Sequence, residues 1–274
     1  MFQLLVLLLL LLHTTDAADY VVISSDIIDP SQPAKIITSI LPGAGNATTG
    51  KPSPPNVNGY LGIVSNGAPH FRSFPPLDGE PCGTRVRTSV TALAHNCRLA
   101  TNAAPFDMDS GACNCGYFIH TNKTYGTGGW KVSFSSTQDG KWVIGTLNAS
   151  IAAQLGVVES VNGFSWLVRD GVNVHTKDTY IAPRTTIGVT RDGKLIMLEV
   201  DGCEAGKDCA WTIGRTEYEM AELLLQHDAY HAINLDGGGS SSFVANGIVM
   251  NHPTDTDVWR VRKERAVTVI GCIV

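Results

Sequence analysis

Charged residues are scarce in this sequence, and basic residues are not in excess. Only 16% of the 274 residues are charged, and the formal net charge is -5. There is no basic stripe of the kind that binds nucleic acid, so no nucleic-acid partner is expected. No internal repeat is visible, so a repeat architecture is not expected. With 43% hydrophobic residues, the chain can still bury a proper core.

Long hydrophobic runs are absent except at the N-terminus. Leu4 to Leu12 is almost unbroken aliphatic, but this run is too short to span a bilayer as a stable anchor. Thr15-Asp16-Ala17 follows as a small-residue cleavage site, so residues 1–17 are interpreted as a secretory signal peptide. An uncleaved short anchor is the alternative. No membrane span is expected in the mature chain, which is predicted to lie in the secretory pathway lumen or to be secreted.

The seven cysteines suggest disulfide bonds with one cysteine left over. Cys203 and Cys209 bracket a short polar segment and could close a small loop. Cys113-Asn114-Cys115 lacks the Cys-X2-Cys spacing of zinc sites, and no pair of histidines is nearby. Neither a metal nor another cofactor is therefore expected.

Three Asn-X-Ser/Thr triplets agree with secretion. They begin at Asn46, Asn122 and Asn148. In a secreted chain such triplets are candidates for N-glycosylation on surface loops.

The chain is interpreted as two parts after the signal peptide. Residues 18–81 contain two strand-like runs and a loop rich in Pro and Gly, and are predicted to form an N-terminal extension packed on a domain of residues 82–274. In that domain, short apolar runs alternate with the turn dipeptides Asp170-Gly171, Asp192-Gly193 and Asn246-Gly247. Most segments are strand-like and at least two are helical. We expect an α+β fold with a mixed, mainly antiparallel curved sheet and packed helices.

The most informative stretch runs from Ile233 to Phe243 and reads Ile-Asn-Leu-Asp-Gly-Gly-Gly-Ser-Ser-Ser-Phe. Upstream, Thr216 and Glu219 have the spacing of a capping box, which predicts the start of a helix. The apolar run that follows the helix predicts a buried strand, so Asp236 falls at the C-terminal end of a strand.

Three glycines follow Asp236 directly. Glycine allows unusual backbone angles and close approach of a ligand, and successive N–H groups in such a loop can converge on an anion. A tight turn capped by Asp236 is the structural alternative. Asn234 faces the same side as Asp236 because side chains alternate along a strand, which favours a binding site for a substrate that carries a phosphate.

A series of sequence blocks around this motif resembles the phosphodiester glycosidase family. The blocks are Cys97–Asn102, Trp166–Gly171, Arg184–Gly188, Asp192-Gly193, Asp201-Gly202, Glu219–Leu225, Ala232–Ser240, Phe243-Val244, Asn246-Gly247 and Val267–Cys272. The resemblance covers roughly Cys82 to the C-terminus. It implies a hydrolase that cleaves the bond between N-acetylglucosamine (GlcNAc) and phosphate in a phosphodiester-linked glycan. The substrate it implies is GlcNAc-phosphate-mannose on a glycoprotein, with mannose 6-phosphate as the product.

The resemblance also implies disulfide pairs. It pairs Cys82 with Cys113 and Cys97 with Cys272. The second pair would join the last strand to the start of the domain. A link that closes so long a loop could add up to about 4–5 kcal/mol of stability in the chain-entropy model.

Candidate catalytic residues follow from the motif and from the matched blocks. Arg184 offers a guanidinium fork for a phosphodiester, with Thr185 beside it. Asp201, like Asp236, ends a strand before a glycine, and two such carboxylates could act as acid and base or as nucleophile and acid. A turn cap is the alternative for Asp201. The expected catalytic residues are Asp236, Asp201 and Arg184. The expected substrate-binding residues are Asn102, Thr185, Asn234, Gly237, Gly238, Gly239 and Ser240.

One segment departs from the family pattern. The family's Asn-Gly-Gly-Phe-Phe reads here as Asn102-Ala103-Ala104-Pro105-Phe106. This change supports the alternative of a secreted, lectin-like protein that binds a sugar phosphate without cleaving it. A third possibility is an enzyme for another phosphodiester-linked glycan. All these hypotheses require Arg184 and Asp236 to meet in one pocket.

Overall fold

The computed structural model describes residues 19–42, 57–77, 81–113, 117–127, 132–202, 214–255 and 262–274. The predicted signal peptide lies outside these ranges, as do Asn46, Cys115, Cys203 and Cys209. None of the described helices combines the length and the apolar character needed to span a bilayer.

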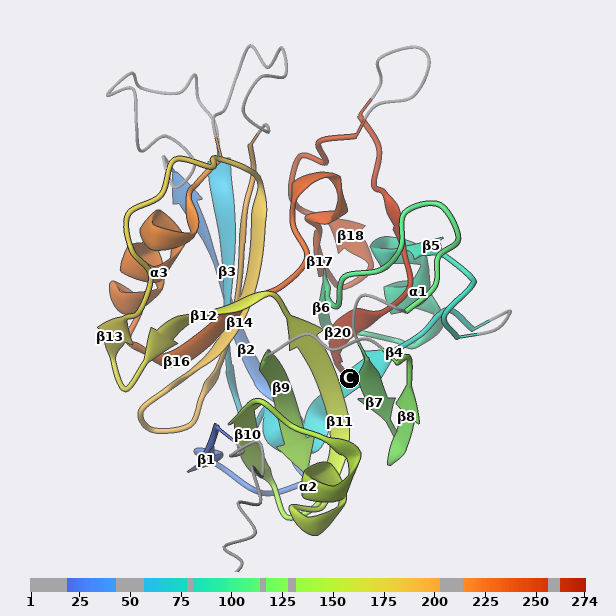
Figure 1. Cartoon of the computed structure of the whole chain (residues 1–274), viewed down its shortest axis with the longest axis vertical. Helices are drawn as coiled ribbons and strands as arrows, with labels where there is room; N and C mark the ends of the chain where they lie inside the picture. The colour runs from blue at the N-terminus through green and yellow to red at the C-terminus, as the bar shows by residue number, and fades with distance from the viewer. Residues whose placement is uncertain are drawn as a thin grey trace, which may run out of the picture.

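Antiparallel sheets dominate the described structure (Figure 1). The seven-stranded sheet has the order β13 (Val172–Asn173), β12 (Ser165–Arg169), β16 (Ala229–Asn234), β14 (Arg184–Thr190), β15 (Leu195–Val200), β3 (Val57–Ser65) and β2 (Lys35–Pro42). The six-stranded sheet has the order β1 (Tyr20–Ser24), β10 (Lys141–Gly145), β9 (Val132–Thr137), β11 (Val157–Gly163), β7 (Phe118–His120) and β8 (Lys123–Tyr125). Strands from both sides of residue 81 share these sheets.

Two smaller sheets complete the strand arrangement. The five-stranded sheet has the order β18 (Ile248–Val249), β17 (Phe243–Ala245), β6 (Leu99–Asn102), β20 (Ile270–Ile273) and β4 (Phe71–Phe74). A two-stranded sheet pairs β19 (Ala266–Val267) with β5 (Val86–Arg87).

Helices are few and short, as expected for a chain in which most segments are strand-like. The short helices are α1 (Thr88–Ala94), α2 (Ala149–Gln154), α3 (Glu217–Leu225), η1 (Ala68–His70) and η2 (Gly238–Ser240). The expectation of a mainly antiparallel α+β fold holds, but the structure has several antiparallel sheets in place of one curved sheet, with few helices beside them. The physical reason lies in the core, where aromatic side chains from different sheets, including Phe71, Phe134, Trp142 and Phe243, form one buried cluster. Sheet packs against sheet, so most apolar faces need no helix.

α3 is the helix that leads to the motif, and it begins as its sequence predicts. The Thr216 hydroxyl accepts the Glu219 N–H at 3.2 Å, and the Glu219 carboxylate accepts the Thr216 N–H at 3.1 Å, so the capping box is confirmed. Met220, Ala221 and Leu224 are buried in a cluster with residues of β12 and β15. The chain then turns into β16, which carries Asn234 as its last residue.

The turn dipeptides also form as predicted. Asp170 and Gly171, with φ of 53° and 72°, join β12 to β13, and Asn246 and Gly247, with φ of 49° and 77°, join β17 to β18. Two consecutive positive φ angles are the mark of a type I′ hairpin turn. Gly193, with φ of 87°, lies in the turn between β14 and β15.

Both disulfides implied by the family resemblance are confirmed. Cys82 bonds to Cys113, and Cys97 bonds to Cys272 across a sequence separation of 175 residues. The second bond lies beside β6 and β20, which already pair as neighbours, so it ties the last strand to the start of the domain.

Two predicted glycosylation sites lie within the described residues. Asn122 and Asn148 are both exposed. The Asn148 Oδ1 atom accepts the Ile151 N–H at 2.9 Å and caps α2. N-glycosylation at either residue stays a prediction.

Candidate active site

The strand register brings the predicted site residues to one edge of the seven-stranded sheet. Thr186 of β14 pairs with Asn234 of β16, and Arg184 pairs with Val200 of β15. Because β14 runs antiparallel to both neighbours, its first residue lies beside the ends of β15 and β16. Asp236 follows the end of β16 directly, so Arg184 and Asp236 meet at this edge.

A cavity of about 340 Å³ opens at the same edge. It is lined by Phe164, Tyr180, Ala182, Arg184, Glu217, Asn234, Asp236, Gly237, Gly238 and Arg265. The condition set by the sequence hypotheses is thus met, since Arg184 and Asp236 share one pocket. A hollow of about 700 Å³ at the opposite end of this sheet, around Arg191 and Tyr230, contains none of the predicted catalytic residues.

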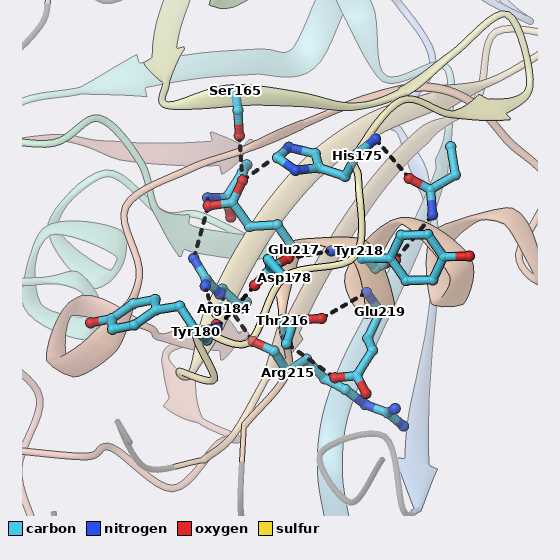
Figure 2. Close-up of polar contacts among 12 residues, drawn as sticks. Ser165, His175, Asp178, Tyr180, Arg184, Arg215, Thr216, Glu217, Tyr218 and Glu219 are labelled. Carbon is cyan, nitrogen blue, oxygen red and sulfur yellow. Dashed lines mark hydrogen bonds and ion pairs between the residues drawn. The ribbon is translucent and has the colours of Figure 1, made fainter. Parts of the chain in front are cut away.

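Glu217 is the centre of the polar network in this cavity (Figure 2). One carboxylate oxygen, Oε2, accepts the Ser165 hydroxyl at 2.7 Å and contacts His175 Nε2 at 3.0 Å. The other, Oε1, accepts N–H groups from Arg184 and Asn234, each at 3.2 Å. Glu217 therefore holds both cavity-lining residues in place.

The electrostatics of this network keep Glu217 ionised. Burial alone raises the pKa of the Glu217 carboxyl, but hydrogen bonds from His175 and Ser165 and the positive charge of Arg184 outweigh burial and lower it. The hydrogen bond to Glu217 raises the pKa of His175 in turn. Neither Glu217 nor His175 was among the predicted site residues. In the sequence, Glu217 appears only as the first residue of a predicted helix.

Arg184 is locked into the wall of the cavity. Its Nε donates to the Arg215 carbonyl at 3.1 Å, Nη2 to the Tyr180 carbonyl at 2.9 Å and Nη1 to Glu217 at 3.2 Å. The guanidinium carbon lies 5.5 Å from the centre of the Tyr180 ring, in cation–π range. These contacts hold the side chain rigidly, which a residue that orients a phosphate needs.

Asp236 is a carboxyl with a perturbed proton affinity. Burial raises the pKa of this group to about 6, although contacts with Ser240, Arg265 and the Gly237 N–H each oppose the change. One carboxylate oxygen accepts the Gly237 N–H at 3.0 Å. The residue remains partly exposed where it faces the cavity, so its carboxyl is surrounded by protein yet can still reach a substrate.

The glycine-rich loop does not form the anion site in the way the sequence suggested. The N–H groups of Gly237, Gly238 and Ser240 already donate to Asp236 Oδ1, the Pro183 carbonyl and the Gly237 carbonyl. These three N–H groups are therefore used within the protein, which differs from the expected convergence of the loop amides on an anion. The glycines are needed for shape instead, since Gly238 has a φ of 58° and a Cβ on Gly239 would collide with the Arg265–Asp255 pair.

Arg265 supplies a second positive charge to the cavity. Its Nε and Nη2 donate to the two carboxylate oxygens of Asp255 at 2.8 and 2.9 Å, and Nη1 contacts the Ser240 hydroxyl at 3.5 Å. The Ser240 side chain is fully buried and positions Arg265 rather than lining the cavity itself. Arg265 was not among the predicted site residues, because it lies outside the motif and the matched blocks.

Asn102 and Thr185 hold the backbone on either side of the glycine-rich loop through hydrogen bonds. Asn102 Nδ2 donates to the Asp236 carbonyl at 2.7 Å, and Asn102 Oδ1 accepts the Thr185 hydroxyl at 2.7 Å and the Ser242 N–H at 3.0 Å. Both side chains are fully buried and do not line the cavity. The structure thus gives them a positioning role in place of the expected contact with substrate.

The altered segment after Asn102 keeps its place in the fold. Ala103 and Ala104 are buried, and neither has a positive φ, so this backbone does not require glycine here. The Ala103 carbonyl accepts the Asp236 N–H at 3.0 Å. The altered segment therefore provides a hydrogen-bond acceptor for the backbone of Asp236.

Asp201 lies at the same sheet edge but does not line this cavity. It is 4% exposed, accepts the His252 N–H at 2.8 Å and contacts Asn251 at 3.3 Å. The structure therefore does not bring Asp201 together with Asp236 and Arg184 around the cavity. Within the described ranges, no three His, Cys, Asp or Glu side chains are arranged to hold a metal ion.

Named mammalian proteins are similar to this chain in sequence. The chain is 32% identical to human N-acetylglucosamine-1-phosphodiester alpha-N-acetylglucosaminidase over 241 residues, which cover 77% of this chain and 45% of the human protein. The bovine protein of the same name is 32% identical over 232 residues, covering 74% of this chain and 42% of that protein. The chain thus spans about half the length of the curated relatives it matches.

Solved structures share the fold. The zebrafish N-acetylglucosamine-1-phosphodiester alpha-N-acetylglucosaminidase catalytic domain, auto-inhibited by its pro-peptide, superposes with a TM-score of 0.76 at 24% identity, covering 94% of this chain and 91% of that chain. A putative exported protein from Burkholderia pseudomallei has a TM-score of 0.55 at 14% identity, covering 84% of this chain and 75% of that chain. Because the phosphodiester glycosidase family model matches residues 95–273, the chain belongs to the phosphodiester glycosidase family.

Proposed function

We propose that this protein hydrolyses the bond between the anomeric carbon of GlcNAc and phosphate in a phosphodiester-linked glycan. The observation that carries the proposal is one cavity lined by two arginines and by two carboxyl groups whose pKa values are moved in opposite directions. In such a pair, the group with the lowered pKa, Glu217, stays charged, and the group with the raised pKa, Asp236, can transfer a proton. The names of the human and bovine relatives specify the same bond.

In the proposed reaction, the guanidinium groups of Arg184 and Arg265 hold the phosphate. The phosphate leaves as an anion, so it needs less proton donation than a sugar alkoxide. Asp236, as a carboxylate, takes a proton from the water that attacks the anomeric carbon. Glu217 stays ionised, orients Arg184 and Asn234, and stabilises positive charge that develops on the sugar ring.

The second sugar in the proposed substrate is mannose on a glycoprotein, so the product carries mannose 6-phosphate. The proposed place of action is the secretory pathway lumen or the outside of the cell. The two disulfides support this location, because such bonds persist in oxidising compartments.

The direct test is to incubate purified protein with GlcNAc-phospho-methylmannoside and, separately, with UDP-GlcNAc, and to measure free GlcNAc. Release from the first compound is the expected result. Binding of that compound without release of GlcNAc would overturn the proposal and support the lectin-like alternative. Release from UDP-GlcNAc alone would point to another phosphodiester-linked substrate.

The raised pKa of Asp236 predicts a specific pH profile. A base acts only when ionised, so kcat/KM should rise about tenfold per pH unit below pH 6 and level off above it. The lowered pKa of Glu217 adds no break near pH 6. The measurement is kcat/KM for GlcNAc release from pH 4.5 to about 8. A kcat/KM that falls from pH 5 to 7 would instead identify Asp236 as a proton donor.

A further inference from the structure

A buried polar network lies beneath the glycine-rich loop, around the segment Ser241–Phe243. Asn251 Nδ2 donates to the Ser241 carbonyl at 3.1 Å, and Asn251 Oδ1 accepts the Phe243 N–H at 2.9 Å. Asn102 accepts the intervening Ser242 N–H at 3.0 Å and also holds the Asp236 carbonyl. Two asparagines therefore set the course of the backbone on the far side of the loop from the cavity.

Asn251 is itself held by two buried acids. Its Nδ2 also contacts Glu199 Oε1 at 3.2 Å and Asp201 Oδ1 at 3.3 Å. With the Ser241 carbonyl, three oxygens thus share the two hydrogens of one amide. Glu199 is fully buried and Asp201 is 4% exposed, so water cannot compensate for a missing contact at either carboxyl.

The remaining two oxygens of these acids have no donor. Glu199 Oε2 and Asp201 Oδ2 are buried and lack a hydrogen-bond partner among the residues that the structure describes. The two carboxyl groups also interact directly with each other. Two adjacent carboxylates in a buried site cannot both ionise without a large penalty. One proton placed between Oε2 and Oδ2 would satisfy both oxygens and remove the repulsion.

Other ionisable groups near the pair do not replace that proton. Burial and the two acids raise the pKa of Tyr60, which faces the pair from β3, to about 12, so the phenol stays neutral. His252 Nδ1 lies 3.8 Å from Asp201 Oδ2, beyond hydrogen-bond distance, and its side chain is 68% exposed.

We propose that Glu199 and Asp201 share a single proton between Oε2 and Oδ2, and that this acid pair positions the glycine-rich loop through Asn251. The pair is a positioning element, because neither acid lines the cavity. Ionising both acids would place two negative charges beside the Asn251 side-chain amide. The hydrogen bonds from Asn251 to the backbone of Ser241 and Phe243 would then weaken. The influence of the acid pair on catalysis rests on the function proposed above. The shared proton itself is independent of that function.

The proposal has a defined consequence for stability. Burial raises the pKa of Glu199, and it raises the pKa of Asp201 to about 6, so the folded protein binds more protons than the unfolded chain. The stability that the pair contributes is complete at low pH. It declines as pH rises above the pKa values of the unfolded acids, because the folded pair keeps a proton that the unfolded chain has lost. A difference of one proton corresponds to a Tm change of about 3–5 °C per pH unit for a protein of this size.

The test compares Tm from pH 5 to about 8 for the wild type and the Glu199→Gln variant. Glutamine keeps the oxygen that faces Asn251 and donates an N–H to Asp201, and the variant pair carries the same charge as the singly protonated pair. The variant should therefore lose the part of the Tm decline that the acid pair causes, and should be at least as stable as the wild type near pH 8. Its infrared spectrum should lack one protonated carboxyl band.

Glu159→Gln is the matched control. Glu159 is similarly buried, but Ser73 and Thr121 donate to its two oxygens and His120 Nδ1 contacts Oε2 at 3.1 Å, so no shared proton is needed. Glutamine would place an N–H of its own against these donors, so Tm should fall at every pH from 5 to about 8, including pH 8, where the Glu199→Gln variant should lose nothing.

Three results would overturn the proposal. One is a Glu199→Gln curve parallel to that of the wild type. Another is a loss of Tm as large as that of Glu159→Gln. The third is a Tm that rises with calcium and falls with a chelator, which would assign the pair to a cation. Absence of GlcNAc release would refute the proposed function and leave the Tm comparison valid.

Discussion

Replacing Asp236 by asparagine is expected to slow GlcNAc release by about 10³-fold, within the range that a positioned acid or base contributes. Asparagine keeps the shape of the side chain and can still accept the Gly237 N–H, so the loop should retain its course. It cannot accept a proton from water. The loss should therefore appear in kcat, with a smaller change in KM, and the residual activity should lack the pH break near 6.

Asp170→Asn is the control for this substitution. Asp170 is exposed in a hairpin turn and has a positive φ, which asparagine tolerates well. Its kcat and Tm should match those of the wild type. Near-normal release of GlcNAc by a correctly folded Asp236→Asn protein would refute the role proposed for Asp236.

Replacing Arg184 by lysine is expected to lower kcat/KM by about 10²–10³-fold, the cost typical of removing one preorganised donor from a charged transition state. Lysine keeps the positive charge but not the planar fork. One ammonium group cannot donate in the fixed geometry that now reaches Arg215, Tyr180 and Glu217. The hydrogen bonds that order this side of the cavity should be lost, and phosphate binding should become weaker.

Arg169→Lys provides the comparison. Arg169 makes a two-point contact with Asp19 through Nη1 and Nη2 and does not line the cavity. The same substitution there should leave kcat/KM unchanged. If Arg184→Lys and Arg169→Lys have equal and small effects on GlcNAc release, phosphate binding must be assigned to other residues.

Local patterns predicted the local structure around the site well. The capping box at Thr216, the turns at Asp170-Gly171 and Asn246-Gly247, and the strand before Asp236 all form where short-range rules place them. These features depend on contacts within a few residues, so the sequence contains the whole interaction. The family resemblance added the two disulfides, which spacing alone leaves open.

Residues that are distant along the chain could not be assigned in this way. Glu217 joins the site because α3 brings it to Asn234 of β16, and His175 joins it through its contact with Glu217. Arg265 reaches the cavity from the segment before β19, and no periodic pattern links that segment to Asp236. The same limit explains why Asp201 was wrongly grouped with Asp236. Both follow a strand and precede a glycine, but the spatial neighbours of Asp201 are Glu199 and Asn251.

By itself the sequence determined the family, the strand-rich fold and the acidic residue that follows β16, and it predicted secretion. It also brought Arg184 and Asp236 into one hypothesis. Only the tertiary structure decided which donors and acceptors face each other. The amides of the glycine-rich loop bond to the protein, while two arginines line the cavity. The physical reason is that charge and hydrogen bonding depend on distance in space, which antiparallel pairing sets between residues far apart in the chain.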